Sequence, residues 1–130
     1  MRARFVSDGY CKVANGAYCE VWLHNSVVKE IKHAPAKDRA KAGEIIERLS
    51  EDGYADFPET AFKFEGRFKA GHKKIAVHAV KAWQIRILGG WCEGNPRRFV
   101  CPEAAIKKRN EADRRQLERV AEKVGEYCGS

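Results

Sequence analysis

The sequence predicts an α+β fold in which an N-terminal strand and a helical hairpin pack on an antiparallel meander sheet, with a helix at the C-terminus. Three observations support this prediction. One β-favouring segment precedes two segments whose apolar residues have helical spacing. Segments with alternating apolar residues follow, and an amphipathic segment comes last. The sequence lacks the β-α-β alternation and the glycine-rich phosphate loop that are typical of doubly wound folds.

The first half of the chain predicts the strand and the helical hairpin. Residues 18–23 favour a strand, and residues 27–33 favour a helix that Asn25 or Ser26 caps. Pro35 ends this helix and suits the first turn of the next one, where a missing N–H has no intrahelical partner. The apolar residues of the second helix follow helical spacing, and Gly53 is a suitable stop: Ala42, Ile45, Ile46 and Leu49.

The second half of the chain predicts the meander and the last helix. Residues 74–80 alternate, which places His78 on the face opposite to the apolar residues. Residues 83–87 alternate in the same way, and Arg86 falls on the face opposite to Trp83, Ile85 and Ile87. We expect Gly89–Gly90 to end that strand, residues 97–101 to form a short strand, and residues 111–127 to form the final helix.

Length and composition indicate one basic domain. The 130 residues fit a single domain over residues 18–130, with residues 1–17 as an N-terminal extension or a loose lead-in hairpin. A chain with 44% hydrophobic and 33% charged residues is neither a disordered tail nor a membrane protein. With no secretory signal and no membrane-spanning run, the sequence predicts a soluble, cytoplasmic protein. Five cysteines without a CxxC pair favour reduced structural thiols.

The positive charge is concentrated in one part of the chain. Residues 66–115 hold thirteen lysines and arginines and four acidic residues, a net charge of +9, whereas the whole chain carries +7. Such a basic segment is typical of a protein with a phosphate-rich partner. A solvated lysine-rich surface and a docking face for an acidic protein are the alternatives.

The sequence contains no familiar catalytic motif. HExxH, GxSxG and Walker A motifs are missing, and no cluster of acidic residues is suited to Mg²⁺. We therefore expect no metal and no cofactor. Arg86 is the most informative cation, because an arginine within an apolar strand points towards a cleft or a partner. A pairing with a helix glutamate or a place on the surface is the alternative for Arg86.

Three short motifs carry a resemblance to a known family. They are Ala82–Arg86, Arg97–Val100, and Ala105–Lys108 followed by Asn110–Asp113 and a helix. In this order they resemble motifs of the RelE/HigB branch of the RelE/ParE-type toxins, which includes phage-derived members. The resemblance covers roughly residues 18–127.

The resemblance implies the toxin component of a toxin-antitoxin system. Such a protein is a metal-independent, ribosome-dependent mRNA endoribonuclease, and its partners are mRNA on the ribosome and a cognate antitoxin protein, with no membrane and no cofactor. A ParE-like gyrase inhibitor is one alternative. A non-catalytic, phage-derived basic module that binds nucleic acid or protein is the other.

Metal-free RNA cleavage assigns roles to the cations. The 2′-hydroxyl attacks the neighbouring phosphorus, so a base must take its proton, cations must stabilise the phosphorane and an acid must protonate the 5′-oxygen. The candidate catalytic residues are Arg86, Arg97 and Arg98 for charge, Lys107 and Lys108 for the base, and His78 for base or acid. The candidate RNA-binding residues are Lys73, Lys74, Lys81, Arg109 and Tyr127. For His78 an ordinary strand histidine is the alternative, and for Tyr127 packing at the helix end.

Overall fold

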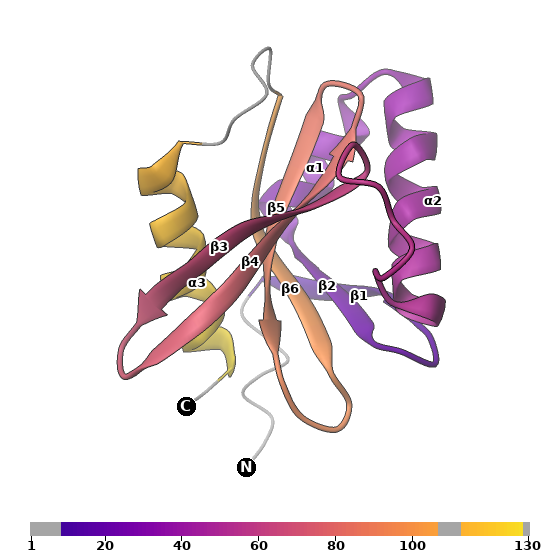
Figure 1. Ribbon diagram of the computed structural model, residues 1–130. Helices are drawn as coiled ribbons and strands as arrows, with labels where there is room; N and C mark the ends of the chain where they lie inside the picture. The colour runs from indigo at the N-terminus through magenta and orange to yellow at the C-terminus, as the bar shows by residue number, and fades with distance from the viewer. Residues whose placement is uncertain (1–8, 107–112, 129–130) are drawn as a thin grey trace.

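Six strands and three helices form among residues 9–106 and 113–128, which are the residues that the computed structural model describes (Figure 1). The architecture is α+β, as the sequence predicts. In chain order the elements are β1 (Tyr10–Asn15), β2 (Glu20–His24), α1 (Asn25–Lys32), α2 (Ala36–Asp52), β3 (Phe62–Ala70), β4 (Lys73–Ala82), β5 (Ile85–Cys92), β6 (Arg98–Ile106) and α3 (Arg114–Cys128).

The strands form one sheet in the order β1-β2-β6-β5-β4-β3. Strands β4 to β6 are the predicted antiparallel meander, β3 extends it by one strand, and β2 pairs with β6 in parallel. Strand β1 pairs with β2 in antiparallel orientation. Residues 10–15 are therefore one edge strand of the sheet and form a hairpin with β2, which was one of the two expectations for this segment.

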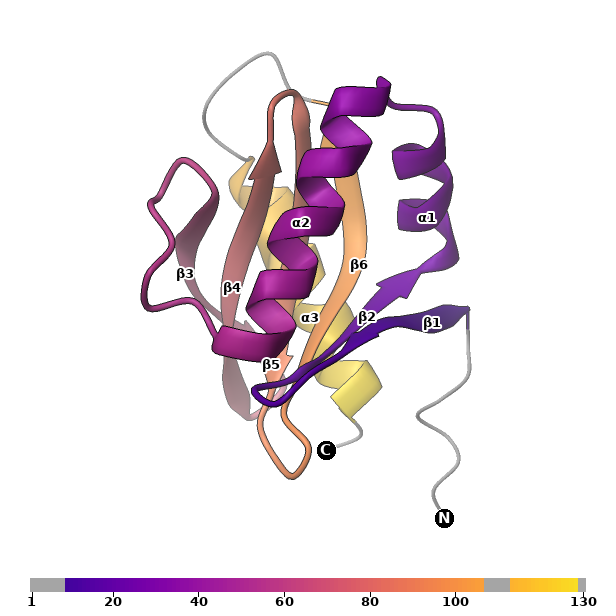
Figure 2. The same ribbon diagram turned by 90° about the vertical axis from the view of Figure 1, so that its right-hand side faces the viewer.

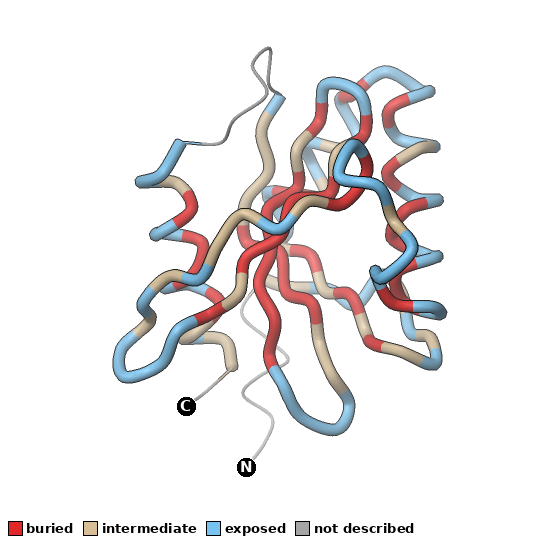
Figure 3. The backbone as a smooth tube through the Cα atoms, viewed as in Figure 1, coloured by how far each residue is buried: buried red, intermediate tan, exposed pale blue. Residues whose placement is uncertain are grey.

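Helices cover both faces of the sheet. Figure 2 shows α1 and α2 in front of the sheet and α3 behind it. The central strands are buried along most of their length (Figure 3) because each strand packs against helices on both sides. The core under α1 and α2 includes Leu23, Ile45, Leu49, Ile87 and Phe99. The core under α3 includes Val77, Leu88, Val100, Val120 and Val124.

Near the start of each helix of the hairpin, a side chain makes a contact that the sequence did not predict. His24 caps α1, because its Nδ1 accepts a hydrogen bond of 3.1 Å from the backbone N–H of Ser26. In α2, Asp38 is buried, and its Oδ2 lies 3.4 Å from the backbone nitrogen of Gln84. Gly53 ends α2 as predicted.

Two strands of the meander are longer than the sequence predicts. Strand β5 continues through Gly89–Gly90, where a Cβ on Gly90 would lie 2.6 Å from a methyl group of Ile75. These glycines therefore allow close packing and do not end the strand. Strand β6 continues past Pro102, because a register shift between Leu88 and Gly90 accommodates the proline in the ladder.

The expectation of five reduced cysteines was wrong for one pair. Cys92 and Cys128 form a disulfide with their Cα atoms 5.6 Å apart. The packing of α3 on β5 brings these residues together across 36 positions of sequence. The spacing of the cysteines alone therefore did not indicate the disulfide. The free cysteines are Cys11, Cys19 and Cys101. Among the described helices, none is long and apolar enough to cross a membrane.

We expect opposite effects of alanine at two glycines. Gly90→Ala should destabilise the fold by about 1–3 kcal/mol, because the new methyl group has no space against Ile75. Gly43→Ala should stabilise it by about 0.5–1 kcal/mol, because Gly43 lies in α2 with no atom within 4 Å of a built Cβ. Urea denaturation of both variants measures these changes. A Gly90→Ala protein as stable as the wild type would contradict the packing account.

Candidate functional site

Three cations from adjacent strands lie at the end of the sheet where β4 turns into β5. Lys81 and Arg86 are direct cross-strand partners, which places their Cβ atoms about 5 Å apart. Lys63 in β3 pairs with Ala79, two residues before Lys81, and is therefore a diagonal neighbour of Lys81. The residues that alternate with these cations are buried under α1 and α2: Phe62, Val80, Ala82, Ile85 and Ile87. Lys63, Lys81 and Arg86 therefore share the opposite face, and we call them the cation site.

The cation site has a surplus of positive charge. Burial lowers the pKa of Lys81, and the charges of Arg86 and Lys63 lower it further, although Glu65 and Glu59 act in the opposite direction. Within residues 9–106 and 113–128, none of the three cations forms an ion pair with a carboxylate. Like charges opposite each other destabilise a sheet. A bound anion such as phosphate would remove this repulsion.

The guanidinium group of Arg86 is oriented by the turn beside it. Its Nη1 lies 2.7 Å from the carbonyl oxygen of Trp83 and 3.3 Å from that of Ile85. Both hydrogen bonds in the described structure use Nη1, which leaves the N–H groups of Nε and Nη2 for a ligand. Two parallel N–H donors of an arginine fit two oxygens of one phosphate.

The predicted cluster of Arg86 with Arg97 and Arg98 does not form. Arg98 pairs with Cys92, whereas Arg86 pairs with Ala105, so these arginines lie at opposite ends of β5 and β6. The antiparallel turn explains the separation, because residues after it lie beside the end of β5 and not its beginning.

Both distant arginines have other contacts. The Nε atom of Arg98 lies 3.3 Å from a carboxylate oxygen of Glu20. The Nε atom of Arg97 lies 3.5 Å from a carboxylate oxygen of Glu93, and its guanidinium carbon is 4.3 Å from the ring centre of Tyr18. Arg97 and Arg98 therefore belong to a separate part of the sheet.

His78 is buried on the other face of the sheet, away from the cation site. The indole N–H of Trp91 donates to Nδ1 of His78 at 3.2 Å, and the ring of Phe62 stacks on the imidazole at 4.7 Å between ring centres. Burial, and then the charge of Arg67, lower the pKa of His78 to about 4. His78 is therefore neutral at pH 7 with its proton on Nε2, which agrees with an ordinary strand histidine.

The remaining predicted site residues are dispersed. Lys73 and Lys74 are exposed where β3 turns into β4, at the end of β4 opposite to Lys81. Tyr127 packs against Tyr10 and Trp22, with ring centres 4.7 and 6.2 Å away. The predictions for Lys107, Lys108 and Arg109 fall outside the described residues.

Lys63 is a member of the cation site that sequence reasoning missed. We expected residues 57–71 to lead into the sheet, whereas most of this segment is strand β3. A usable signal was present, because Phe62 and Phe64 alternate with Lys63. A register shift between Phe64 and Gly66 ends this alternation after three residues.

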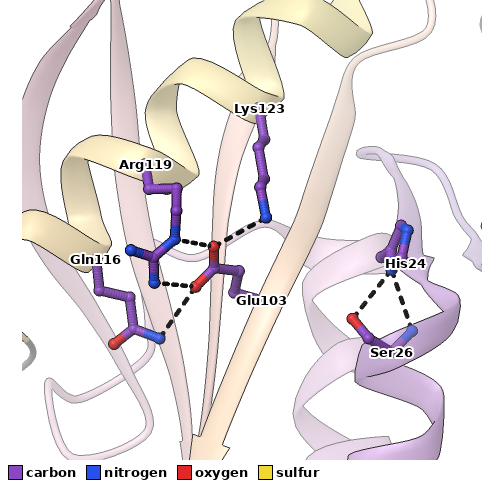
Figure 4. A network of polar contacts seen from close by, with 6 residues as sticks. All are labelled: His24, Ser26, Glu103, Gln116, Arg119 and Lys123. Carbon is purple, nitrogen blue, oxygen red and sulfur yellow. Dashed lines mark hydrogen bonds and ion pairs between the residues drawn. The ribbon is translucent and has the colours of Figure 1, made fainter.

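A second polar cluster joins α3 to β6 (Figure 4). The carboxylate of Glu103 accepts hydrogen bonds from Arg119 at 2.6 and 2.8 Å, from Lys123 at 3.1 Å and from Gln116 at 3.2 Å. Burial alone would raise the pKa of Glu103, but these hydrogen bonds lower it to about 2. A cleft of about 520 Å³ beside it has His24 and Ser26 among its lining residues. The four donors saturate this carboxylate, so it anchors the helix.

The chain matches no protein-family model, no curated protein and no solved structure. In the described part of the chain, no group of three or more His, Cys, Asp or Glu residues is placed to hold a metal ion.

The buried His78 predicts a loss of stability in mild acid. Its pKa is about 4 in the folded protein and near 6.5 when unfolded, so between these values only the unfolded chain takes up the proton. Stability should therefore fall by about 2–4 kcal/mol as the pH drops from 6.5 to 4 and should not change above 6.5 on this account. His78→Gln should remove this part of the pH dependence in urea denaturation. The exposed His72 provides the control, because the His72→Gln variant should keep the pH dependence of the wild type. An equal loss of pH dependence in both variants would contradict the assignment to His78.

Proposed function

We propose that this protein is the toxin component of a toxin-antitoxin system that binds mRNA on the ribosome in the cytoplasm and cleaves it without a metal. The observation that carries the proposal is the pair of Lys81 and Arg86, two cations opposite each other with no carboxylate partner in the described structure. The segment Ala82–Arg86 resembles a motif of RelE/HigB-type toxins and ends with Arg86, one member of this pair. A cognate antitoxin is the second proposed partner.

The cation site contains groups for each step of metal-free cleavage. The fork of Arg86 holds the oxygens of the scissile phosphate. Lys81 takes the proton of the 2′-hydroxyl in its neutral form, which the lowered pKa makes more accessible. The 2′-oxygen then bonds to phosphorus while the bond from phosphorus to the 5′-oxygen breaks. The ammonium group of Lys63 gives its proton to that oxygen, so the products are a 2′,3′-cyclic phosphate and a 5′-hydroxyl.

Substitutions in the cation site should reduce cleavage strongly. Arg86→Ala should slow the cleavage of ribosome-bound mRNA by about 10²–10³-fold, the usual loss for a donor that stabilises a transition state. Arg86→Lys should recover only part of the rate, because an ammonium group lacks the two parallel donors. Lys81→Gln should also slow cleavage, because an amide cannot act as the base. The assay measures fragments from mRNA on purified ribosomes.

A matched control separates this effect from a general loss of charge. Lys69 is exposed near the other end of β3, so Lys69→Gln should cleave at the wild-type rate. Thermal melting should show that each variant is folded, and Lys69→Gln, at an exposed position, should melt within about 0.5 kcal/mol of the wild type. A folded Arg86→Ala protein that cleaves normally would refute the proposal. Inhibition of gyrase supercoiling without cleavage would indicate the ParE-like alternative, and nucleic-acid binding without either activity would indicate a non-catalytic module.

A further inference from the structure

Trp83 has an unusual combination of conformation and exposure. It is the first of two residues in the turn between β4 and β5, and its φ of 59° is left-handed, which bulky residues rarely adopt. Glycine or asparagine fits such a turn without strain. Trp83 is nevertheless 60% exposed, so burial of the indole does not offset the free-energy cost of the strained backbone. Strain of this kind is concentrated at functional positions.

Neighbouring elements hold the turn in place. The guanidinium of Arg86 donates to the carbonyl oxygen of Trp83 at 2.7 Å. From the first turn of α2, the Nζ atom of Lys37 lies 4.7 Å from the centre of the indole, and buried Asp38 accepts from the backbone N–H of Gln84 at 3.4 Å. Figure 1 shows the turn at the top of the molecule, beside the start of α2. The indole is therefore an exposed ring on a turn whose backbone is held by Arg86 and Asp38.

We propose that Trp83 stacks on an unpaired base of a single-stranded RNA whose phosphates bind at the cation site. The guanidinium of Arg86 contacts the backbone of Trp83, so the cation site and the ring lie at one turn. The ring is on the α2 side of the sheet and the cations are on the other side, so the bound strand passes over the turn. Lys37 covers one side of the indole, and the other side is the surface for the base. A duplex keeps its bases stacked on each other, so it cannot make this contact. The inference rests on the proposed RNA function for the identity of the ligand.

The substitution Trp83→Asn tests stacking apart from folding. Asparagine tolerates a left-handed backbone, so this variant should melt at a higher temperature than the wild-type protein. It should bind a short oligoadenylate about ten- to one-hundred-fold more weakly, the loss expected for one stacked base. Trp83→Phe keeps an aromatic ring and should retain most of the affinity. Phe64 is a matched control, because it is 50% exposed in β3, and Phe64→Ala should bind within about twofold of the wild type.

Salt dependence and a base-free probe distinguish stacking from charge. The slope of log affinity against log salt should be unchanged in Trp83→Asn, whereas Arg86→Ala should reduce the magnitude of this negative slope by about 0.7, the value for one phosphate of a single strand. Inorganic polyphosphate has phosphates and no bases, so Trp83→Asn should bind it like the wild-type protein.

The outcomes separate the two proposals. Wild-type affinity for oligoadenylate in Trp83→Asn, together with weaker binding by Arg86→Ala, would overturn stacking and leave the cation site intact. An equal loss of polyphosphate binding in Trp83→Asn would also overturn stacking. If the wild-type protein binds oligoadenylate no better than the Arg86→Ala variant, the proposed RNA function fails, and the inference fails with it.

Discussion

The pairing of β4 with β5 is the constraint on which the candidate site depends. A two-residue turn fixes the register of both strands and places Lys81 opposite Arg86. The neighbours of these cations along each strand are buried under α1 and α2, so a shift of one residue would bury both charges and expose the core. The apolar core therefore holds together two like charges that their mutual repulsion would separate. Such an arrangement is most stable when an anion lies between them.

The carboxylates that hold the helices are engaged elsewhere. Glu103 anchors α3 through four hydrogen bonds, and buried Asp38 contacts the turn from α2. Neither forms an ion pair with Lys81 or Arg86. The contact of Asp38 that helps to fix the turn thus leaves the cations available to a ligand. This division of roles connects the packing of the helices to the proposed recognition of RNA.

The sequence was sufficient to predict the architecture and the face on which Arg86 lies, because both follow from the spacing of apolar residues. It was not sufficient to place Arg98, since the distance from Arg86 depends on how far β5 continues beyond Gly89–Gly90. Lys63 was missed because the irregular register of β3 shortens its alternation. The disulfide between Cys92 and Cys128 depends on the packing of α3, which residue spacing does not encode.

The titration of Lys81 tests whether Lys81 and Arg86 form an anion site. Nuclear magnetic resonance of the lysine side chains can follow its pKa in the free protein and with a short oligoadenylate bound. In the free protein the pKa should lie below the ordinary lysine value, because Lys81 is partly buried beside Arg86. The pKa should rise on binding, since a phosphate favours the charged ammonium group. An ordinary pKa that does not change with RNA would contradict the claim that Lys81 and Arg86 form an anion site.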